Sequence, residues 1–178
     1  RRRGKTAREA LEELERDPTY VAQRDERERV LLERDRALAK EEQPILRDLA
    51  RVGVEVESVY DLVNGPSNYS HALPVLIDHL QRPYSPAIRD GIARAVAMPE
   101  AWPSWSILKR LYEQEEDYGV RQGLAVALSN AATDDALEEL VSLAGDRRQG
   151  GSRVLLLDYL RRSRDPKAVK ALMSLGSD

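Results

Sequence analysis

The sequence predicts an all-α fold, a right-handed α-solenoid of about three and a half stacked helix pairs that follows a helical extension. An internal repeat of 32 residues carries this prediction, because it recurs in two separate sets of positions. One set has an arginine followed by aliphatic residues: Arg89, Arg121, Arg153; Ile92, Leu124, Leu156; Val96, Leu128, Leu160. The other set is apolar: Leu73, Trp105, Leu137, Val169; Leu76, Leu108, Leu140, Leu172. Two sets with one period indicate a unit of helix A, turn, helix B and turn.

Each predicted helix has a single apolar stripe at spacings of three and four residues. Such a helix cannot bury its stripe alone, so neighbouring units must stack. The repeat domain is expected over residues 43–178, with approximate units 43–70, 71–102, 103–134, 135–166 and a partial unit 167–178.

Proline and glycine punctuate these units. Pro83 and Pro86 bracket the first clear A–B turn, and Gly150-Gly151 mark the third. Asp165-Pro166 predicts the start of the fourth A helix, with the aspartate as N-cap and the proline at the first helical position.

The first unit is degenerate. Its A helix is expected at Pro44, Ile45, Leu46 and Leu49. Its B helix is expected around Val56, Val59, Tyr60 and Val63, ended by Asn64-Gly65-Pro66.

Residues 1–42 differ in composition and are expected to form a charged helical extension. A short helix over 6–16 would be capped by Thr6 with Glu9, and a long charged helix would follow from Tyr20 to about Gln43. Glutamates and arginines three and four residues apart support an exposed helix. We favour a cap packed on the first unit; the alternative is a protruding arm that forms a homodimer or binds a partner.

Both ends of the chain suggest a longer protein. The sequence does not begin with methionine, and the A helix expected over 167–175 is followed only by Gly176-Ser177-Asp178. Because terminal repeats normally carry a polar cap, we favour an array that is cut within a unit.

An arginine that opens helix B, with Leu or Ile three residues later, resembles the short HEAT-like repeats of bacterial proteins. Arg89, Arg121 and Arg153 carry the resemblance, which covers roughly residues 43–178. It implies an α-solenoid fold and says little about function, since the family includes scaffolds, bilin lyase subunits and an unusual group of DNA glycosylases.

Composition narrows the function classes. The net charge is −3, which argues mildly against a general nucleic-acid binder. There is no cysteine, so disulfides, thiol chemistry and cysteine-ligated metals are excluded. No apolar run is long enough to span a membrane and no secretory signal is visible, so we expect a cytoplasmic protein.

The arginines suggest two kinds of site. Arg89, Arg121 and Arg153 either form an anion-binding ladder or tie helix B to acidic or carbonyl groups of a neighbouring repeat; constant register favours the tie. A second group is locally dense and could attract nucleic acid, although a solvated face is the default. Its members are Arg147, Arg148, Arg153, Arg161, Arg162 and Arg164.

Aromatic residues in turns are the other candidates for partner contacts. Trp102 lies in an inter-repeat turn and is the best single choice, since tryptophan is frequent in binding hot spots. Packing is nevertheless its favoured role. Tyr84, Tyr112 and Tyr118 lie near A–B turns and are expected to share a surface.

No catalytic signature is present. The sequence has no phosphate-binding glycine loop and no nucleophile elbow, and His71 and His79 lie too far apart for a helical metal pair. We therefore expect a non-catalytic scaffold or adaptor without a cofactor, which binds a protein partner through its solenoid surface. The alternatives are a nucleic-acid binder that uses the arginines at 147–164, and a glycosylase- or lyase-type enzyme.

Overall fold

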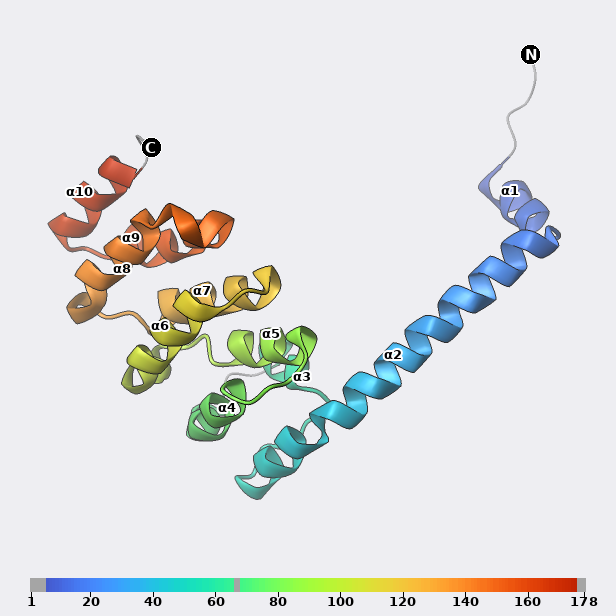
Figure 1. The fold of residues 1–178 in the computed structure, drawn as a ribbon, viewed down its shortest axis with the longest axis horizontal. Helices are drawn as coiled ribbons and strands as arrows, with labels where there is room; N and C mark the ends of the chain where they lie inside the picture. Colours follow the sequence, from blue (N-terminus) through green and yellow to red (C-terminus); the bar gives the residue numbers. More distant parts are fainter. Residues whose placement is uncertain (1–5, 66–67, 176–178) are drawn as a thin grey trace, which may run out of the picture. The chain divides into compact units, whose positions relative to one another are not determined.

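The computed structural model describes residues 6–65 and 68–175, and every regular element in this part of the chain is helical (Figure 1). Pro66 and the last three residues, Gly176, Ser177 and Asp178, lie outside the described ranges, as does the side chain of Glu9. The chain divides into two compact units, Arg1–Lys40 and Glu41–Asp178.

The elements follow one another without any strand between them in the described ranges. The α-helices are α1 Ala7–Leu14, α2 Pro18–Arg51, α3 Val59–Asn64, α4 Leu73–Leu80, α5 Pro86–Ala95, α6 Trp105–Gln114, α7 Tyr118–Ala131, α8 Leu137–Gly145, α9 Leu157–Arg162 and α10 Pro166–Leu175. The 3-10 helices are η1 Ser70–Ala72, η2 Pro99–Ser104, η3 Asp134–Ala136 and η4 Arg147–Leu156.

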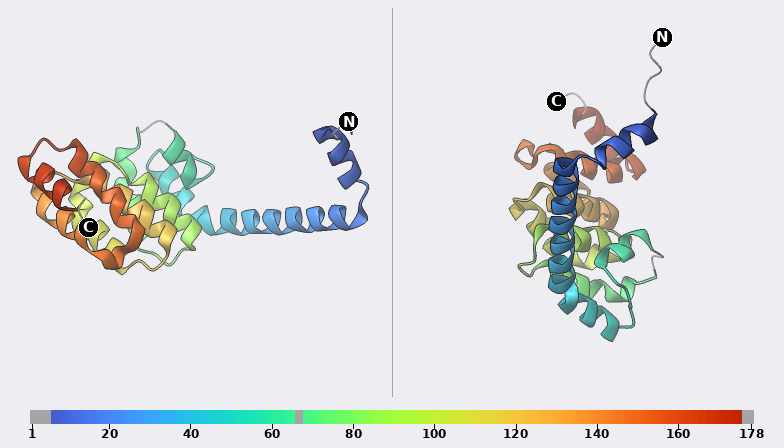
Figure 2. Two further views of the ribbon diagram at one scale, coloured as in Figure 1. Left: turned by 90° about the horizontal axis from the view of Figure 1, so that it is seen from above. Right: turned by 90° about the vertical axis from the view of Figure 1, so that its right-hand side faces the viewer.

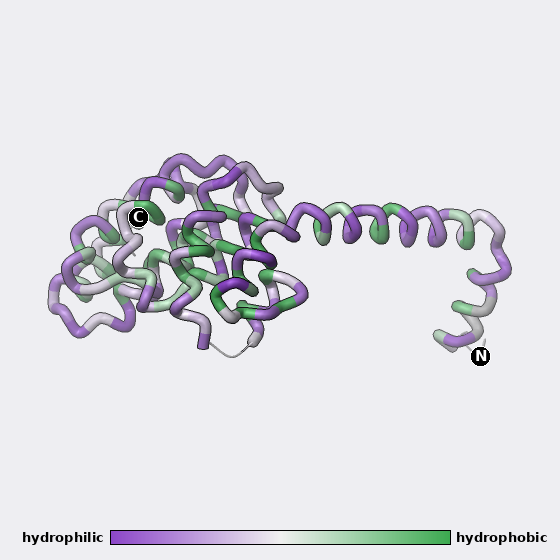
Figure 3. Tube along the Cα trace, turned by 90° about the horizontal axis from the view of Figure 1, so that it is seen from below, coloured by the Kyte–Doolittle hydropathy of each residue, from purple (hydrophilic) through white to green (hydrophobic). Residues whose placement is uncertain are grey.

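The first unit contains α1 and the amino-terminal part of α2. Hydrophilic residues dominate this part of α2, with separate hydrophobic positions between them (Figure 3). Ion pairs within the helix stabilise it: Arg29 lies 2.7 Å from Glu26 and 2.7 Å from Glu33. The expected pairing of residues three and four apart is confirmed here, and such exposed pairs support the helix only weakly.

The expected end of the long helix near Gln43 is wrong. Helix α2 continues through Pro44 to Arg51, so the A helix predicted at 44–49 is the last part of α2. Pro44 has no N–H to donate to the carbonyl of Lys40. The helix persists because Glu42, Ile45 and Leu49, at helical spacing, are buried in the second unit.

A buried carboxylate fixes the start of the second unit. Glu42 accepts hydrogen bonds from the backbone N–H of Val59 at 2.6 Å and the hydroxyl of Ser58 at 3.0 Å. Ser58 also caps α3 in a capping box with Asp61. The expected second helix is therefore real but short, since α3 begins at Val59 and Val56 lies before it.

The second unit is built from helices that pack in pairs. Helix α4 packs on α5, α6 on α7, and α8 on η4. The second members of these pairs also pack on one another in sequence, from α3 to α5, α7 and η4 (Figures 1 and 2). Asp165 accepts a hydrogen bond from the backbone N–H of Lys167 at 2.7 Å, which confirms the predicted start of α10 at Pro166.

The repeated positions form the core. Ile92, Leu124 and Leu156 are fully buried, and the leucines of the first helices at positions 76, 108 and 140 are equally inaccessible. The last copy differs, because Leu172 is half-buried and Val169 is 48% exposed.

The third B helix is irregular. The segment predicted to be one helix from Gly151 is 3-10 in geometry until Leu156, and only α9 is an α-helix. Gly150 interrupts the 3-10 segment with φ 61° and ψ −146°, a conformation that only glycine adopts readily.

Shortening a buried and an exposed side chain of the repeat should lower the free energy of unfolding by different amounts. We expect Leu124→Ala to lower the free energy of unfolding by about 2–5 kcal/mol, because it leaves a cavity in a fully buried site. Val169→Ala should change it by about 0.5 kcal/mol or less. Urea unfolding followed by circular dichroism measures both; equal losses would contradict the core assignment.

Candidate functional site

The three repeated arginines bind groups within the second unit. Arg89 forms an ion pair with the buried carboxylate of Glu115, in the next helix pair. The Nε of Arg121 donates to the carbonyl of Glu115 at 2.9 Å, and Nη1 of Arg153 donates to the carbonyl of Ala144 at 3.1 Å. The arginines therefore bind acidic or carbonyl groups, as one of the two interpretations expected. Only Arg89 reaches the next helix pair; Arg121 and Arg153 bind carbonyl groups of their own pair.

Glu115 is the centre of the turn between α6 and α7. Its carboxylate also accepts the backbone N–H groups of Glu116 at 3.1 Å and Asp117 at 3.0 Å. Asp117 in turn caps α7 by accepting the N–H of Val120 at 3.0 Å. One buried side chain thus holds the turn and joins two helix pairs.

The next unit carries the opposite charge at this position. Arg147 lies one repeat of 32 residues after Glu115, just as Arg121 lies one repeat after Arg89. One repeat later, the residues that correspond to the Arg89–Glu115 pair are therefore two arginines, Arg121 and Arg147. Arg121 and Arg153 bind carbonyl oxygens, which orient the guanidinium groups without cancelling their charge.

A glycine turn lies between these arginines. Asp146 begins it by accepting the N–H of Arg148 at 3.1 Å. The hydroxyl of Ser152 donates to the carbonyl of Gln149 at 2.7 Å, and the hydroxyl of Tyr112 lies 3.1 Å from that of Ser152. Because the serine proton is already engaged, Tyr112 is the donor of this second bond.

The expectation that Tyr112 shares an exposed surface with Tyr84 and Tyr118 does not fit this geometry. Tyr112 is fully buried, because its ring fills the core and its hydroxyl anchors the glycine turn. This burial raises the pKa of its phenol. Tyr84 is half-buried and stacks on His79, with the two rings 5.8 Å apart.

The glycine turn, Tyr118, Arg147, Arg153 and Val154 form one surface, which we call the glycine-turn surface. A cavity of about 410 Å³ lies over the turn and is lined by Arg147, Gly150, Gly151, Arg153 and Val154. The hydroxyl of Tyr118 is 3.2 Å from where a Cβ on Gly151 would lie, so the tyrosine borders this cavity. Tyr118 is 57% exposed and Val154 55% exposed.

A smaller polar cavity of about 280 Å³ lies beside the same turn. It is lined by Glu113, Arg121, Asp146, Arg148 and Gln149, so two acids share it with the two arginines. Arg148 binds Asp146 at 2.9 Å and lowers the pKa of that carboxyl to about 2, chiefly by hydrogen bonding. Arg148 is therefore already paired with an acid.

Arg161 and Arg162 lie apart from the arginines at the glycine turn. Arg161 pairs with Asp158 at 3.5 Å, and Arg162 donates to the carbonyl of Ser129 at 2.9 Å. Both lie at the end of α9, about 15–20 Å along the helix from the glycine turn by the usual helical rise. They do not belong to the glycine-turn surface.

Trp102 has an intramolecular partner. Its ring lies 5.6 Å from that of Trp105 at an interplanar angle of 42°, and its side chain is half-buried in η2.

The ring nitrogens of His79 are both occupied, by Asp48 at 3.0 Å and by the hydroxyl of Tyr84 at 2.8 Å. The His79 contact lowers the pKa of Asp48.

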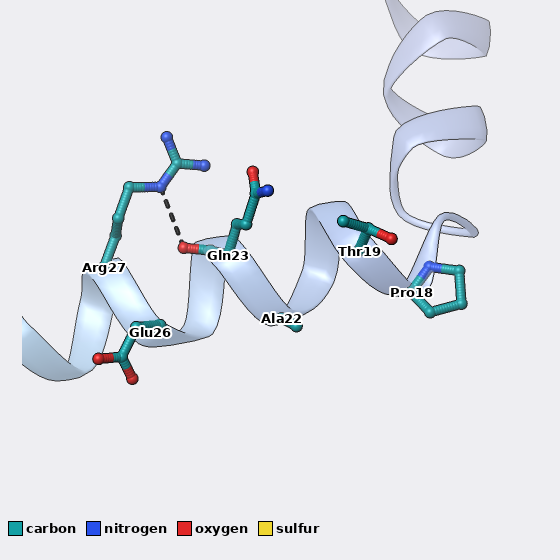
Figure 4. Close-up of a pocket in the computed structure, with 6 residues that line it drawn as sticks. All are labelled: Pro18, Thr19, Ala22, Gln23, Glu26 and Arg27. Atoms are coloured by element: carbon teal, nitrogen blue, oxygen red, sulfur yellow. Dashed lines mark hydrogen bonds between the residues drawn. The ribbon is translucent and has the colours of Figure 1, made fainter.

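A depression in the first unit offers no converging groups. Its described lining comes entirely from α2, and the side chains spread over successive turns of that helix (Figure 4). They are Pro18, Thr19, Ala22, Gln23, Glu26 and Arg27. The Nε of Arg27 is already bonded to the carbonyl of Gln23 at 3.1 Å.

No protein family, curated protein or solved structure matches this chain. Within residues 6–65 and 68–175, no helix combines the length and the apolar character of a membrane span. The same residues contain no cluster of three or more His, Asp or Glu side chains suited to a metal ion.

Sequence reasoning missed the acids and polar residues that hold the site. Glu115, Gln149 and Ser152 are buried, and nothing in their local pattern distinguishes them from exposed polar residues. The signal for the surface itself was present, because arginines flank Gly150-Gly151 on both sides.

The turn between α6 and α7 predicts a strong effect of one acid. Glu115→Ala should lower the free energy of unfolding by about 3 kcal/mol, because it leaves Arg89 unpaired and two backbone N–H groups without an acceptor. The neighbouring exposed Glu116→Ala should cost about 0.5 kcal/mol or less. Denaturant unfolding of both variants is the measurement, and a neutral Glu115→Ala would refute the role.

Asp146 predicts a local pH dependence. A carboxyl with a lowered pKa in the folded state stabilises the fold above its unfolded pKa, and that contribution disappears as the pH falls through the folded value of about 2. Arg148→Ala should raise the pKa of Asp146 toward its ordinary value of 3.8. Carboxyl-carbon NMR titration follows this shift; an unchanged pKa would show that Arg148 is not its cause.

Proposed function

We propose that this chain is a non-catalytic protein-binding module, an α-solenoid of HEAT-like helix pairs, whose glycine-turn surface binds an acidic segment of a partner protein. Arg153 and the neighbouring Arg121, whose guanidinium groups are oriented by carbonyl oxygens, lie beside an exposed tyrosine, and this is the observation that carries the proposal.

The packing supports the architectural part. Successive B helices pack on one another, and the A helices α4, α6 and α8 pack on α5, α7 and η4. The columns at a step of 32 residues are buried in three consecutive copies, as expected when each unit covers its neighbour. The repeated arginines bind groups at or near the ends of the A helices.

The chemistry of the surface supports an acidic partner. The guanidinium groups of Arg121 and Arg153 are held by carbonyl oxygens and keep their full charge. A carboxylate binds such a group through short, charge-assisted hydrogen bonds. Tyr118 and Val154 add exposed apolar area next to the charges, and the glycines leave the backbone accessible.

The same residues favour binding over catalysis. Arginine stays protonated in proteins, and neither tyrosine nor valine exchanges protons readily near neutral pH. His79 is fully buried, and both of its ring nitrogens are occupied by Asp48 and Tyr84.

Nucleic acid is less well supported than protein. Binding along a phosphate backbone needs several cations in a row. Arg148 and Arg161 are each paired with an aspartate, and Arg162 lies at the far end of the segment. The cavity over the glycine turn matches a short acidic segment better than a long polyanion.

Affinity capture from cells of the source organism, with nuclease and mass spectrometry, tests this function. We expect a nuclease-resistant protein, recovered in stoichiometric amount by the wild-type chain. Val154→Asp should reduce its recovery at least about tenfold, because it places a negative charge beside the acidic ligand. Val169→Asp, at a valine of similar exposure on α10, is the matched control and should retain it.

Loss with both valine variants would locate the interaction elsewhere. Partners that disappear on nuclease treatment would favour the nucleic-acid alternative. A competing peptide of eight glutamates should displace the captured protein; if it does not, the ligand is not an acidic segment.

A further inference from the structure

Each of the three asparagines in the chain stands before a different residue. The pairs are Asn64-Gly65, Asn68-Tyr69 and Asn130-Ala131. An asparagine loses ammonia when the backbone nitrogen of the next residue attacks its side-chain amide carbon. Glycine obstructs this attack least, because it has no Cβ and its backbone is the most flexible. A hydrogen bond within a helix occupies the attacking N–H, so the structure decides which pair can react.

The Asn64-Gly65 pair lies where α3 ends. Asn64 is the last residue of α3 and is exposed, and Gly65 continues in an extended conformation with φ −97° and ψ −173°. Within the described ranges, no acceptor binds the N–H of Gly65. The helices α5 and α7 end differently, because the N–H of Val96 donates back into α5 at 3.0 Å and that of Ala132 into α7 at 2.9 Å. The nitrogen that must attack is therefore free only after α3 among these three helix ends.

The fold also requires both members of this pair. A Cβ at position 65 would lie 2.6 Å from the backbone carbonyl oxygen of Asp61, which cannot move aside as a flexible side chain could. Any residue other than glycine is therefore strained there. The side-chain Nδ2 of Asn64 donates to the carbonyl of Tyr60 at 3.2 Å, in the last turns of α3.

The other two asparagines are held more firmly. Asn130 lies inside α7, the residue after it belongs to the same helix, and its Oδ1 accepts a hydrogen bond from Arg162 at 3.3 Å. Asn68 is exposed, but the next residue, Tyr69, is buried and its hydroxyl donates to the carbonyl of Ala95 at 2.9 Å. The backbone that follows each of them is therefore fixed.

We propose that Asn64 is a deamidation site of the folded protein and that the product loosens α3. The Gly65 nitrogen forms a bond to Cγ of Asn64, the Cγ–Nδ2 bond breaks, and the proton lost by the Gly65 nitrogen leaves with the amide as ammonia. Water then opens the succinimide ring at either carbonyl. One opening gives aspartate, and the other gives isoaspartate, in which the β-carbonyl carries the chain. One ammonia is lost and one water is gained, without oxidation or reduction.

The effect on α3 follows from the contacts at its end. A carboxylate at position 64 cannot donate to the carbonyl of Tyr60, and it places a negative charge at the negative end of the helix dipole. Isoaspartate also lengthens the backbone by one carbon atom. Helix α3 has six residues and depends on packing: Val59 and Leu62 are buried, and the hydroxyl of Tyr60 donates to Asp90 of α5 at 3.0 Å. Deamidation therefore weakens the first contact in the series of stacked B helices.

Peptide mass spectrometry of the full chain, incubated in mildly alkaline buffer with and without urea, tests the site. In the folded protein, Asn64 should convert at least about tenfold faster than Asn68 or Asn130. Isoaspartate, detected by enzymatic methylation of its carboxyl group, should accompany aspartate because both come from the succinimide. The rate at Asn64 in urea should lie within about tenfold of the folded rate, since the fold leaves the N–H of Gly65 free.

Variants at the two exposed asparagines test the consequence. Asn64→Asp reproduces one product and should speed hydrogen exchange of the α3 amides about two- to fivefold, the effect of one charge at an exposed helix end. Asn68→Asp adds the same charge outside α3 and should leave this exchange unchanged. Asn64→Gln keeps an amide but disfavours the five-membered ring, so it should abolish the modification and preserve the exchange rates.

Three results would overturn the site: conversion of Asn64 no faster than that of Asn68, aspartate without isoaspartate, or a folded rate more than about tenfold below the rate in urea. The last result would mean that the fold protects Asn64. Unchanged hydrogen exchange of α3 in Asn64→Asp, or an equal change in Asn68→Asp, would refute the loosening of α3.

Discussion

Glu115 connects two helix pairs through both of its ends. Its carboxylate binds Arg89 of the preceding pair, and its carbonyl accepts the guanidinium of Arg121. A charge buried to this degree is tolerated only when it is paired and fully hydrogen-bonded, so the α6–α7 turn, the cap of α7 and the position of α5 are coupled.

The glycine-turn surface shows how a sequence repeat can keep its apolar positions while its polar residues change. The step of 32 residues places Arg147 where Glu115 stands one unit earlier, and Arg147 and Arg153 line the cavity over the glycine turn. The same step relates Trp105, Lys109 and Glu139 to aliphatic residues on both sides, Leu73, Ile77 and Ile107 before them and Leu137, Val141 and Ala171 after them.

Helix α2 shows a similar separation of local and tertiary effects. Its first part depends on ion pairs within the helix, such as Arg29 with Glu26 and Glu33. Its last part is held by burial of Glu42, Ile45 and Leu49. Pro44 removes one backbone hydrogen bond near the division at Lys40 and Glu41, and burial in the second unit compensates for that loss.

The sequence by itself determined the helical class, the repeat of 32 residues and the positions of α4, α6, α7 and α10, because apolar periodicity and capping residues are local signals. It could not place Tyr112 in the core or Glu115 at the centre of a turn. Their partners, Ser152 and Arg89, lie 40 and 26 residues away in the chain. It also misjudged Pro44, since local propensity ends a helix there and only burial sustains it. Tertiary structure decided which arginines are neutralised, because that depends on whether an acid or a carbonyl oxygen lies opposite each guanidinium group.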